Sequence, residues 1–104
     1  MELHNMFSGK DLMVAQRIQR RRLQILVHSA IYYIFNDNIV SDITWSHWGL
    51  ELVELQKKYP DIAEKVVYAD AFRNWDASTG FNLPINDEWV LSKAQYLLRL
   101  HSQN

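Results

Sequence analysis

Apolar residues recur along most of the chain at the three- and four-residue steps of an amphipathic helix. From residue 11 to residue 35 there is neither glycine nor proline, and the apolar positions fall near helical spacing. The segment Asn36-Asp37-Asn38 favours a turn, because Asn and Asp side chains bond to nearby backbone and tolerate left-handed conformations. The pattern predicts one long first helix, either continuous or broken or bent near its arginines, that begins with a capping box between Ser8 and Asp11.

A second helix is predicted to begin at Ser41 or Asp42, either of which can cap it, and to end near Tyr59. Its apolar stripe follows steps of three, four and three residues and consists of Trp45, Trp48, Leu52 and Leu55. Gly49 lies inside this helix, where a glycine lowers the stability of the helix by roughly 1 kcal/mol relative to alanine. A glycine in that position suggests the close approach of another helix.

Pro60 ends the second helix and can open a third, which the apolar spacing extends over residues 61–75. The stretch 74–86 contains glycine and proline and is typical of a long loop. A last helix is predicted after a cap at Asn86 and before a frayed tail, with an inner face of Val90, Ala94, Leu97 and Leu98. We therefore expect an all-α fold, a single domain over residues 1–104 of about four helices with one long loop.

Composition fits a small folded domain and narrows the classes of function. The 104 residues are 48% hydrophobic, and we expect most of the four Trp, five Tyr and four Phe to lie in one core. A net charge of −1 is not that of a dedicated nucleic-acid binder.

The lack of cysteine excludes disulfides, and the four histidines lack metal-ligand spacing, so no metal site is expected. Without a signal-peptide pattern or a long apolar run, we expect a cytoplasmic protein with no membrane partner.

A set of ordered motifs lies in residues 28–62, HSAIYYIFNDNIVSDITWSHWGLELVELQKKYPDI. The first is an aromatic pair, Tyr32-Tyr33, and the second is a turn, Val40-Ser41-Asp42. A helix with Glu51-Leu52 and Leu55 follows, and it ends at Tyr59-Pro60-Asp61. Their order resembles the N-terminal, nucleotide-binding helical region of bacterial NAD-dependent DNA ligases. The resemblance covers a helix–turn–helix segment at 21–61 and is typical of short ligase-related proteins of phages and prophages.

The resemblance implies a ligand site, because this region of the ligases binds the nicotinamide mononucleotide half of NAD. The candidate ligand residues are Tyr32, Tyr33, Asp42 and Trp45. Aromatic rings would stack on the nicotinamide, and a carboxylate would accept hydrogen bonds from ribose hydroxyls or the carboxamide. Two positions depart from the family, since Trp45 stands in place of a tyrosine and Ser46 in place of an aspartate.

The resemblance does not extend to catalysis. The ligase nucleophile lies in a Lys-x-Asp-Gly motif on a separate domain, and these 104 residues contain no such motif. The family's zinc finger would need cysteines, which the chain lacks. We therefore expect a protein that is not an enzyme and that holds no resident cofactor.

Two further features are candidates for contacts with macromolecules. The main charge cluster consists of Arg17, Arg20, Arg21 and Arg22, of which the first three share a helix face and suit ion pairs, phosphate or an acidic protein. The loop at 74–81 combines Trp75, Asp76 and Phe81 with small polar residues. Such a loop is typical either of a recognition element or of a loop held down by its aromatic side chains. His28 and His47 are expected to be structural.

These observations predict a small, non-catalytic binding protein of phage or prophage type. The first hypothesis is protein–protein interaction, for instance inhibition of a host or defence protein, because two ligand positions have changed and the aromatic loop has no ligase counterpart. One alternative is a module that binds nicotinamide mononucleotide or NAD. Another is a nucleic-acid accessory protein that uses the arginine face at 17–22.

Overall fold

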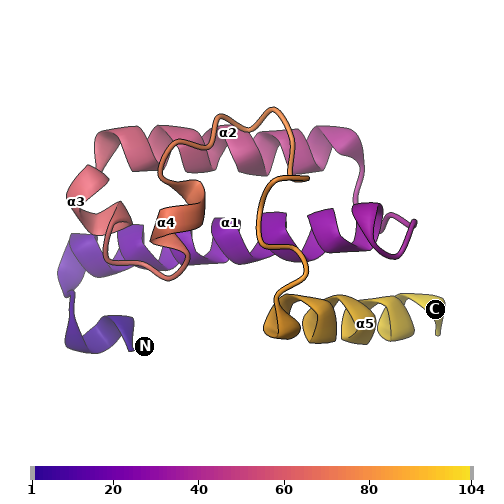
Figure 1. Cartoon of the computed structure of the whole chain (residues 1–104). Coiled ribbons are helices and arrows are strands. Elements are labelled where there is room, and N and C mark those ends of the chain that lie inside the picture. The colour runs from indigo at the N-terminus through magenta and orange to yellow at the C-terminus, as the bar shows by residue number, and fades with distance from the viewer. Residues whose placement is uncertain (1, 104) are drawn as a thin grey trace.

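One long helix organises the chain. In the computed structural model, which describes residues 2–103, α1 (Gly9–Tyr33) lies between α2 (Asp42–Lys58) on one side and α5 (Glu88–Ser102) on the other (Figure 1). A short 3-10 helix, η1 (Leu3–Asn5), packs on α1 near its start. The fold is a small all-helical domain, so the predicted fold class is confirmed. The helix α1 runs unbroken through its arginines.

The predicted third helix over 61–75 is wrong. The chain forms instead two single-turn helices, α3 (Pro60–Ala63) and α4 (Ala69–Phe72), with turns between them. Tyr68 precedes α4 in a left-handed backbone conformation, with φ of 66°, which no continuous right-handed helix can contain. The apolar periodicity was therefore a correct guide to which residues are buried and a poor guide to the backbone.

The buried side chain of Arg22 explains the break. It is 1% exposed, and its guanidinium donates to the carbonyl oxygens of Ala63, Val66 and Val67 at 3.0 to 3.1 Å. In a continuous helix these carbonyls would instead accept from N–H groups four residues further on. The same guanidinium donates twice to Oε1 of Gln56 on α2, at 2.8 and 3.0 Å. Burial lowers the pKa of Arg22 to about 10, so the group stays charged at neutral pH.

The core lies along α1 and is closed by the elements on either side. Its fully buried side chains include Ile18, Ile25, Leu26, Ile31, Leu52, Phe72 and Val90. Phe72 is the one fully buried aromatic side chain among residues 2–103, and seven others pack partly buried against the core. Five aromatic side chains are exposed, namely Tyr32, Tyr33, Phe81, Trp89 and Tyr96. None of the helices in the described part of the chain is both long enough and apolar enough to cross a membrane.

The helix ends follow the sequence only in part. Ser41 caps α2, because its Oγ accepts from the backbone N–H of Thr44 at 3.1 Å, and Asp42 is the first residue inside the helix. Ser8 precedes α1 but forms no side-chain cap, so the predicted capping box is absent there. The helix α5 follows Asp87 rather than Asn86 and continues to Ser102, so the first two residues of the tail predicted at 101–104 are helical, and Asn104 lies outside the described residues.

The long loop at 74–86 leaves α4, passes over α2 and returns across α1 to α5 (Figure 1). Two glycines permit this path. A Cβ at Gly49 of α2 would lie 3.1 Å from both Ala77 Cβ and Trp75 Cη2, so its close neighbour is this loop and not the helix predicted. A Cβ at Gly80 would lie 2.1 Å from Ser29 Oγ, so the loop backbone touches α1 directly.

The first prediction concerns Arg22. Replacement by methionine keeps an unbranched apolar stem but removes the guanidinium, and three carbonyls and the Gln56 amide oxygen lose the donor that Arg22 supplies. We expect the free energy of unfolding to fall by about 3–5 kcal/mol, as when a buried charged group is removed from its partners. Urea denaturation followed by circular dichroism measures this change. The matched control is Arg20→Met on the exposed side of α1, which should shift the value by about 0.5 kcal/mol or less. Equal effects at the two positions would contradict the role given to Arg22.

The second prediction concerns the loop. Gly80→Ala forces the added methyl group into Ser29, so the loop must move away from α1, and we expect a loss of about 1–3 kcal/mol in unfolding free energy. Asn82→Ala, at an exposed position two residues away, is the control and should be nearly neutral. Thermal unfolding of both variants compares them. A neutral Gly80→Ala variant would mean that the loop does not rest on α1 in solution.

Candidate functional site

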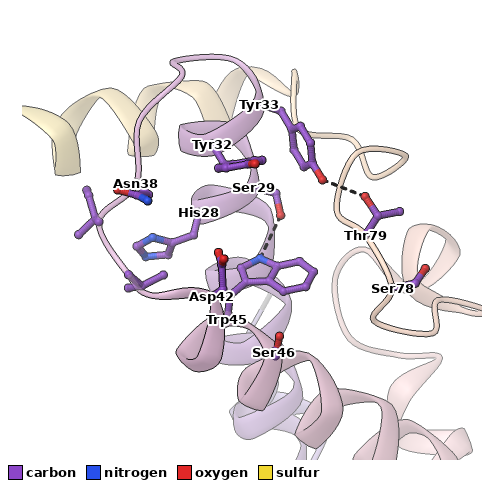
Figure 2. Close-up of a pocket in the computed structure, with 12 residues that line it drawn as sticks. His28, Ser29, Tyr32, Tyr33, Asn38, Asp42, Trp45, Ser46, Ser78 and Thr79 are labelled. Atoms are coloured by element: carbon purple, nitrogen blue, oxygen red, sulfur yellow. Dashed lines mark hydrogen bonds between the residues drawn. The ribbon is translucent and has the colours of Figure 1, made fainter.

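A cavity of about 260 Å³ lies where the end of α1, the start of α2 and the long loop meet (Figure 2). We refer to it as the α1–α2 cavity. The helix α1 lines it from His28 to Tyr33, and the following turn contributes Asn38, Ile39 and Val40. Ser78 and Thr79 of the loop form another part of the wall. Segments that lie as far apart in sequence as His28 and Thr79 therefore enclose one space.

The residues implied by the ligase resemblance converge on this cavity. Tyr32, Tyr33, Asp42 and Trp45 all line it, together with Ser46. Figure 2 shows the Tyr32 ring and the Trp45 indole facing the same space, with Asp42 beside the indole. Because Ser41 provides the cap of α2, the exposed carboxylate of Asp42 is not needed to cap the helix and remains available to a ligand.

Trp45 is held in place from two sides. Its Nε1 donates to Ser29 Oγ on α1 at 3.3 Å (Figure 2). Its ring also meets that of Trp75 edge-on, at 5.9 Å between centroids. With its N–H already used, the indole offers a ligand mainly its aromatic surface. A tyrosine at this position would have offered a hydroxyl.

The two adjacent tyrosines have different roles. The Tyr33 hydroxyl is hydrogen-bonded to Thr79 Oγ1 at 3.0 Å (Figure 2). Its ring packs edge-on against that of Phe81, at 5.3 Å between centroids. Tyr33 therefore ties α1 to the long loop. The Tyr32 ring packs edge-on against that of Tyr33 at 4.8 Å and is 56% exposed at the cavity. Tyr32 is thus the aromatic side chain that is held in position and still open to a ligand.

The loop that carries Trp75, Asp76 and Phe81 is held down by internal contacts. Trp75 Nε1 donates to the carbonyl oxygen of Thr79 at 2.7 Å, and the indole packs on Phe72 and on Gly49. Hydrogen bonds from the hydroxyl and the backbone N–H of Ser78 lower the pKa of Asp76. Of the three predicted interaction residues, Phe81 alone presents a large exposed apolar side chain. The geometry favours the interpretation of this loop as a wall of the cavity.

His28 is a cavity residue that the sequence analysis assigned a purely structural role. Its Nδ1 is buried and has no hydrogen-bond partner within residues 2–103, and its ring lies 5.4 Å from that of Trp48. Burial lowers the pKa of His28. The helical i, i+4 relation to Tyr32 is the signal that would have placed it on the cavity side of α1. His47 is exposed on α2 and is not among the cavity residues.

The four clustered arginines do not form one exposed patch. Arg22 is buried, and the Nε atoms of Arg17 and Arg21 both donate to the carboxylate of Glu51 on α2, at 2.8 and 2.5 Å. Arg20 is exposed and has no salt bridge within residues 2–103, and it lines a second hollow together with Arg17. The prediction of a shared face is right for Arg17 and Arg21, whose charges are paired there with an acidic side chain. The prediction of a surface patch that includes Arg22 is wrong.

A second, more open hollow of about 750 Å³ lies between α1 and α5, and we call it the α1–α5 groove. Met13 and Trp89 give it an apolar lining and are 71% and 45% exposed. Its charged lining residues are Arg17, Arg20 and Lys93, with no Asp or Glu among the lining residues, which span 13–28 and 89–97. The groove is therefore both apolar and locally basic on a chain of net charge −1.

The chemistry of the α1–α2 cavity suits binding. It combines aromatic surfaces, one carboxylate, one imidazole and several hydroxyl groups. Across residues 2–103 no three side chains of His, Asp or Glu gather as metal ligands. The lining thus offers aromatic surface to a flat ring and hydrogen-bonding groups to polar atoms attached to it.

Part of the chain is similar to bacterial DNA ligases. Over 49 residues, 47% of the chain, it is 39% identical to a DNA ligase of Pseudothermotoga lettingae, and over 49 residues it is 37% identical to a DNA ligase of Petrotoga mobilis. The chain spans 7% of the length of each of these curated relatives. No protein-family model matches the chain, and no solved structure matches it. The chain therefore contains a region related to a short segment of bacterial DNA ligases.

Proposed function

We propose that this protein is a small non-catalytic module that binds nicotinamide mononucleotide, free or as half of NAD, in the α1–α2 cavity. The observation that carries the proposal is the convergence of Tyr32, Asp42 and Trp45 on one cavity. These are residues that the ligase resemblance implies for the same ligand. The partial similarity to two DNA ligases supports the assignment.

The charge and shape of the ligand match the cavity. The nicotinamide ring of the mononucleotide is a flat cation, and the faces of Tyr32 and Trp45 attract such a ring. Asp42 adds an opposite charge and accepts hydrogen bonds from ribose hydroxyls. Drug-sized ligands usually fill roughly 300–1,000 Å³. A cavity of about 260 Å³ accordingly suits the nicotinamide riboside part and leaves the phosphate at the mouth.

The long loop offers replacements for the polar groups changed in this chain. Ser46 has a hydroxyl where the ligases have a carboxylate, and Trp45 has no free donor. Ser78 and Thr79 bring two further hydroxyl oxygens to the opposite wall, where Thr79 Oγ1 is also bonded to Tyr33 and the Ser78 hydroxyl to Asp76. We infer that the binding site has been rebuilt around the loop, with lower affinity than a site with two carboxylates would have for a cationic ring.

The third prediction tests this function by calorimetric titration with nicotinamide mononucleotide. The wild-type chain should bind it saturably, with a dissociation constant in the high-micromolar range. Tyr32→Ala removes one aromatic face and should weaken binding about tenfold, equivalent to about 1.4 kcal/mol. The melting temperature should hardly change, because Tyr32 is exposed.

The matched control is Tyr96→Ala. Tyr96 is similarly exposed, at 46%, but lies on α5 and is not among the cavity residues. This variant should bind the mononucleotide like the wild type. The absence of saturable binding in the wild-type chain would refute the proposed function, and equal losses in both variants would refute the assignment of the site.

The second candidate function is protein–protein interaction, with the α1–α5 groove as the docking surface. The specific support is that its charged residues are all basic while Met13 and Trp89 expose apolar surface between them. Such a groove suits an amphipathic helix with an acidic face. Inhibition of a host or defence protein by a phage-type chain is the form of this function that we propose.

The fourth prediction tests the groove with two synthetic helical peptides of about 18 residues, with leucine at the spacing of one helix face. The peptide with glutamate on the other face should shift the NMR signals of Met13 and Trp89, and the peptide with lysine should not. The double variant Arg20→Glu, Lys93→Glu should abolish the effect.

A short DNA duplex serves as the third probe in that experiment. Preferential binding of DNA that falls steeply with salt concentration would replace this candidate by the nucleic-acid hypothesis. Shifts of the same size with both peptides would mean that the groove does not recognise charge and would refute the acidic-helix candidate.

A further inference from the structure

The helix α5 carries an apolar stripe that is open to solvent. This helix packs on α1 at the edge of the molecule, on the side away from α2 (Figure 1). Its inward side chains Val90 and Ala94 are buried, whereas Trp89, Tyr96 and Leu100 are 45%, 46% and 42% exposed. Steps of seven and four residues place these three on one line along the helix. Contiguous apolar surface of this kind marks a site of association more often than isolated exposed residues do.

Lys93 completes this line between Trp89 and Tyr96, and we call the four residues with Leu100 the α5 stripe. The Lys93 Nζ lies 5.4 Å from the centroid of the Tyr96 ring. The four positions follow one another at steps of four, three and four, so their spacing is the same from either end of the helix. A face with such symmetric spacing can meet a second copy of itself in the reverse direction, with every position opposed by another.

A polar line runs beside the α5 stripe and has opposite charges at its two ends. Glu88 in the first turn of α5 and Arg99 in the last turn are both exposed. They are eleven residues apart, about three helical turns, so they project on the same side of the helix. Between them lie the uncharged side chains of Ser92 and Gln95. Neither Glu88 nor Arg99 forms an ion pair within residues 2–103, so both charges are available to a partner.

An antiparallel pair of α5 helices matches the charges of this polar line. Around a two-fold axis, the same flank of each helix faces that of the other. Glu88 of each copy then lies opposite Arg99 of the other copy, and the contact occurs twice. A parallel pair would instead oppose Glu88 to Glu88 and Arg99 to Arg99, which like-charge repulsion disfavours.

The same pairing matches the α5 stripe. Trp89 lies opposite Leu100 of the other copy, so apolar surface meets apolar surface at both ends. At the centre, Lys93 lies opposite the Tyr96 ring of the other copy, a cation–π pairing of the kind that these two residues already form within one helix. Apolar, cationic and acidic groups on this face therefore each find a complement in the same face.

We propose that the face of α5 formed by the α5 stripe and the polar line is a self-association surface, on which a second copy of this chain docks with its own α5 antiparallel. A second copy fits better than an acidic helix or an anionic lipid surface, because Glu88 would repel either of these. The inference does not depend on nucleotide binding, since the lining described for the α1–α2 cavity comes from α1, α2, the turn between them and the long loop.

The dimer covers part of the α1–α5 groove. Trp89 and Lys93 belong both to the α5 stripe and to the lining of that groove. A second copy and the acidic peptide proposed for the groove therefore compete for the same two side chains. Self-association at high protein concentration withholds the groove from other partners.

The association is expected to be weak. Each copy contributes three apolar side chains that are already about half buried in the monomer. This places the interface among the small, transient ones, with a total buried area below about 1,200 Å². We expect a dissociation constant on the order of 100 µM and a monomer in dilute solution.

The fifth prediction is tested by analytical ultracentrifugation of the full chain at low salt, over protein concentrations from about 10 µM to about 1 mM. The wild type should pass from monomer to dimer over this range. Glu88→Arg sets like charges opposite each other at both ends of the interface and should raise the dissociation constant about tenfold. Arg99→Glu should have the same effect for the same reason.

The double variant Glu88→Arg, Arg99→Glu exchanges the two charges, so each acid again lies opposite a base. It should restore the dissociation constant of the wild type, a recovery that damage to α5 would not produce. The matched control is Glu54→Arg, an equal change of charge at an exposed position on α2, which should leave the dimer unchanged. Melting temperatures in dilute solution check that every variant is folded.

The remaining outcomes all overturn the inference. They include a wild-type chain that is monomeric at the highest concentration and a dimer that Glu88→Arg leaves unchanged. A double variant as weak as the single variants would mean that the helices do not meet in the proposed direction. A monomer whose Trp89 signal shifts with the acidic helical peptide, or with vesicles of phosphatidylcholine and phosphatidylserine, would assign this face to that other partner.

Discussion

A single buried guanidinium determines how the second half of the chain is arranged. Arg22 reaches from α1 to Gln56 on α2 and to three carbonyls, one at the end of α3 and two in the segment that follows it. Gln56 Nε2 donates in turn to the Phe72 carbonyl at 3.0 Å, and Phe72 packs against Trp75, a neighbour of Trp45 in the cavity wall. Desolvation of the cation costs several kcal/mol and is offset only because its donors are all directed at acceptors. The cavity thus depends on a residue that does not line it.

Local sequence predicted those parts of the fold that local forces determine. The helices α1, α2 and α5 have clear apolar periodicity, and polar turn residues separate the first two. The interval from Ala63 to Tyr68 is different, because its carbonyls bond to an arginine more than forty residues earlier in the chain. Periodicity contains no information about such a contact. Arg22 was predicted to lie on a surface patch for a similar reason, because the spacing of the four arginines along α1 does not show which of them is buried.

The candidate site was predictable as far as a resemblance extended. Tyr32, Asp42 and Trp45 were identified from their order in a ligase-like segment, and they do meet in space. Ser78 and Thr79 were missed because nothing near them in sequence relates them to α1. The contact of Gly80 with Ser29, which brings them there, depends on the absence of a side chain. His28 was visible on a helical wheel beside Tyr32, but its lack of a partner became apparent only with its surroundings in place.

The contacts of Arg22 mean that the ligase-like segment cannot be grafted alone into another protein without losing part of its structure. The helix pair at 21–61 contains Arg22 and Gln56 but none of the three carbonyls that accept from the guanidinium, and it lacks the loop wall of the cavity. Transplanted alone into another scaffold, it would present a cation to an apolar interface. A graft that keeps both the contacts of Arg22 and the walls of the cavity must include at least residues 22–79. Among related chains, Arg22 and Gln56 should accordingly be replaced together, with the 63–67 turn returning to helix when the pair is lost.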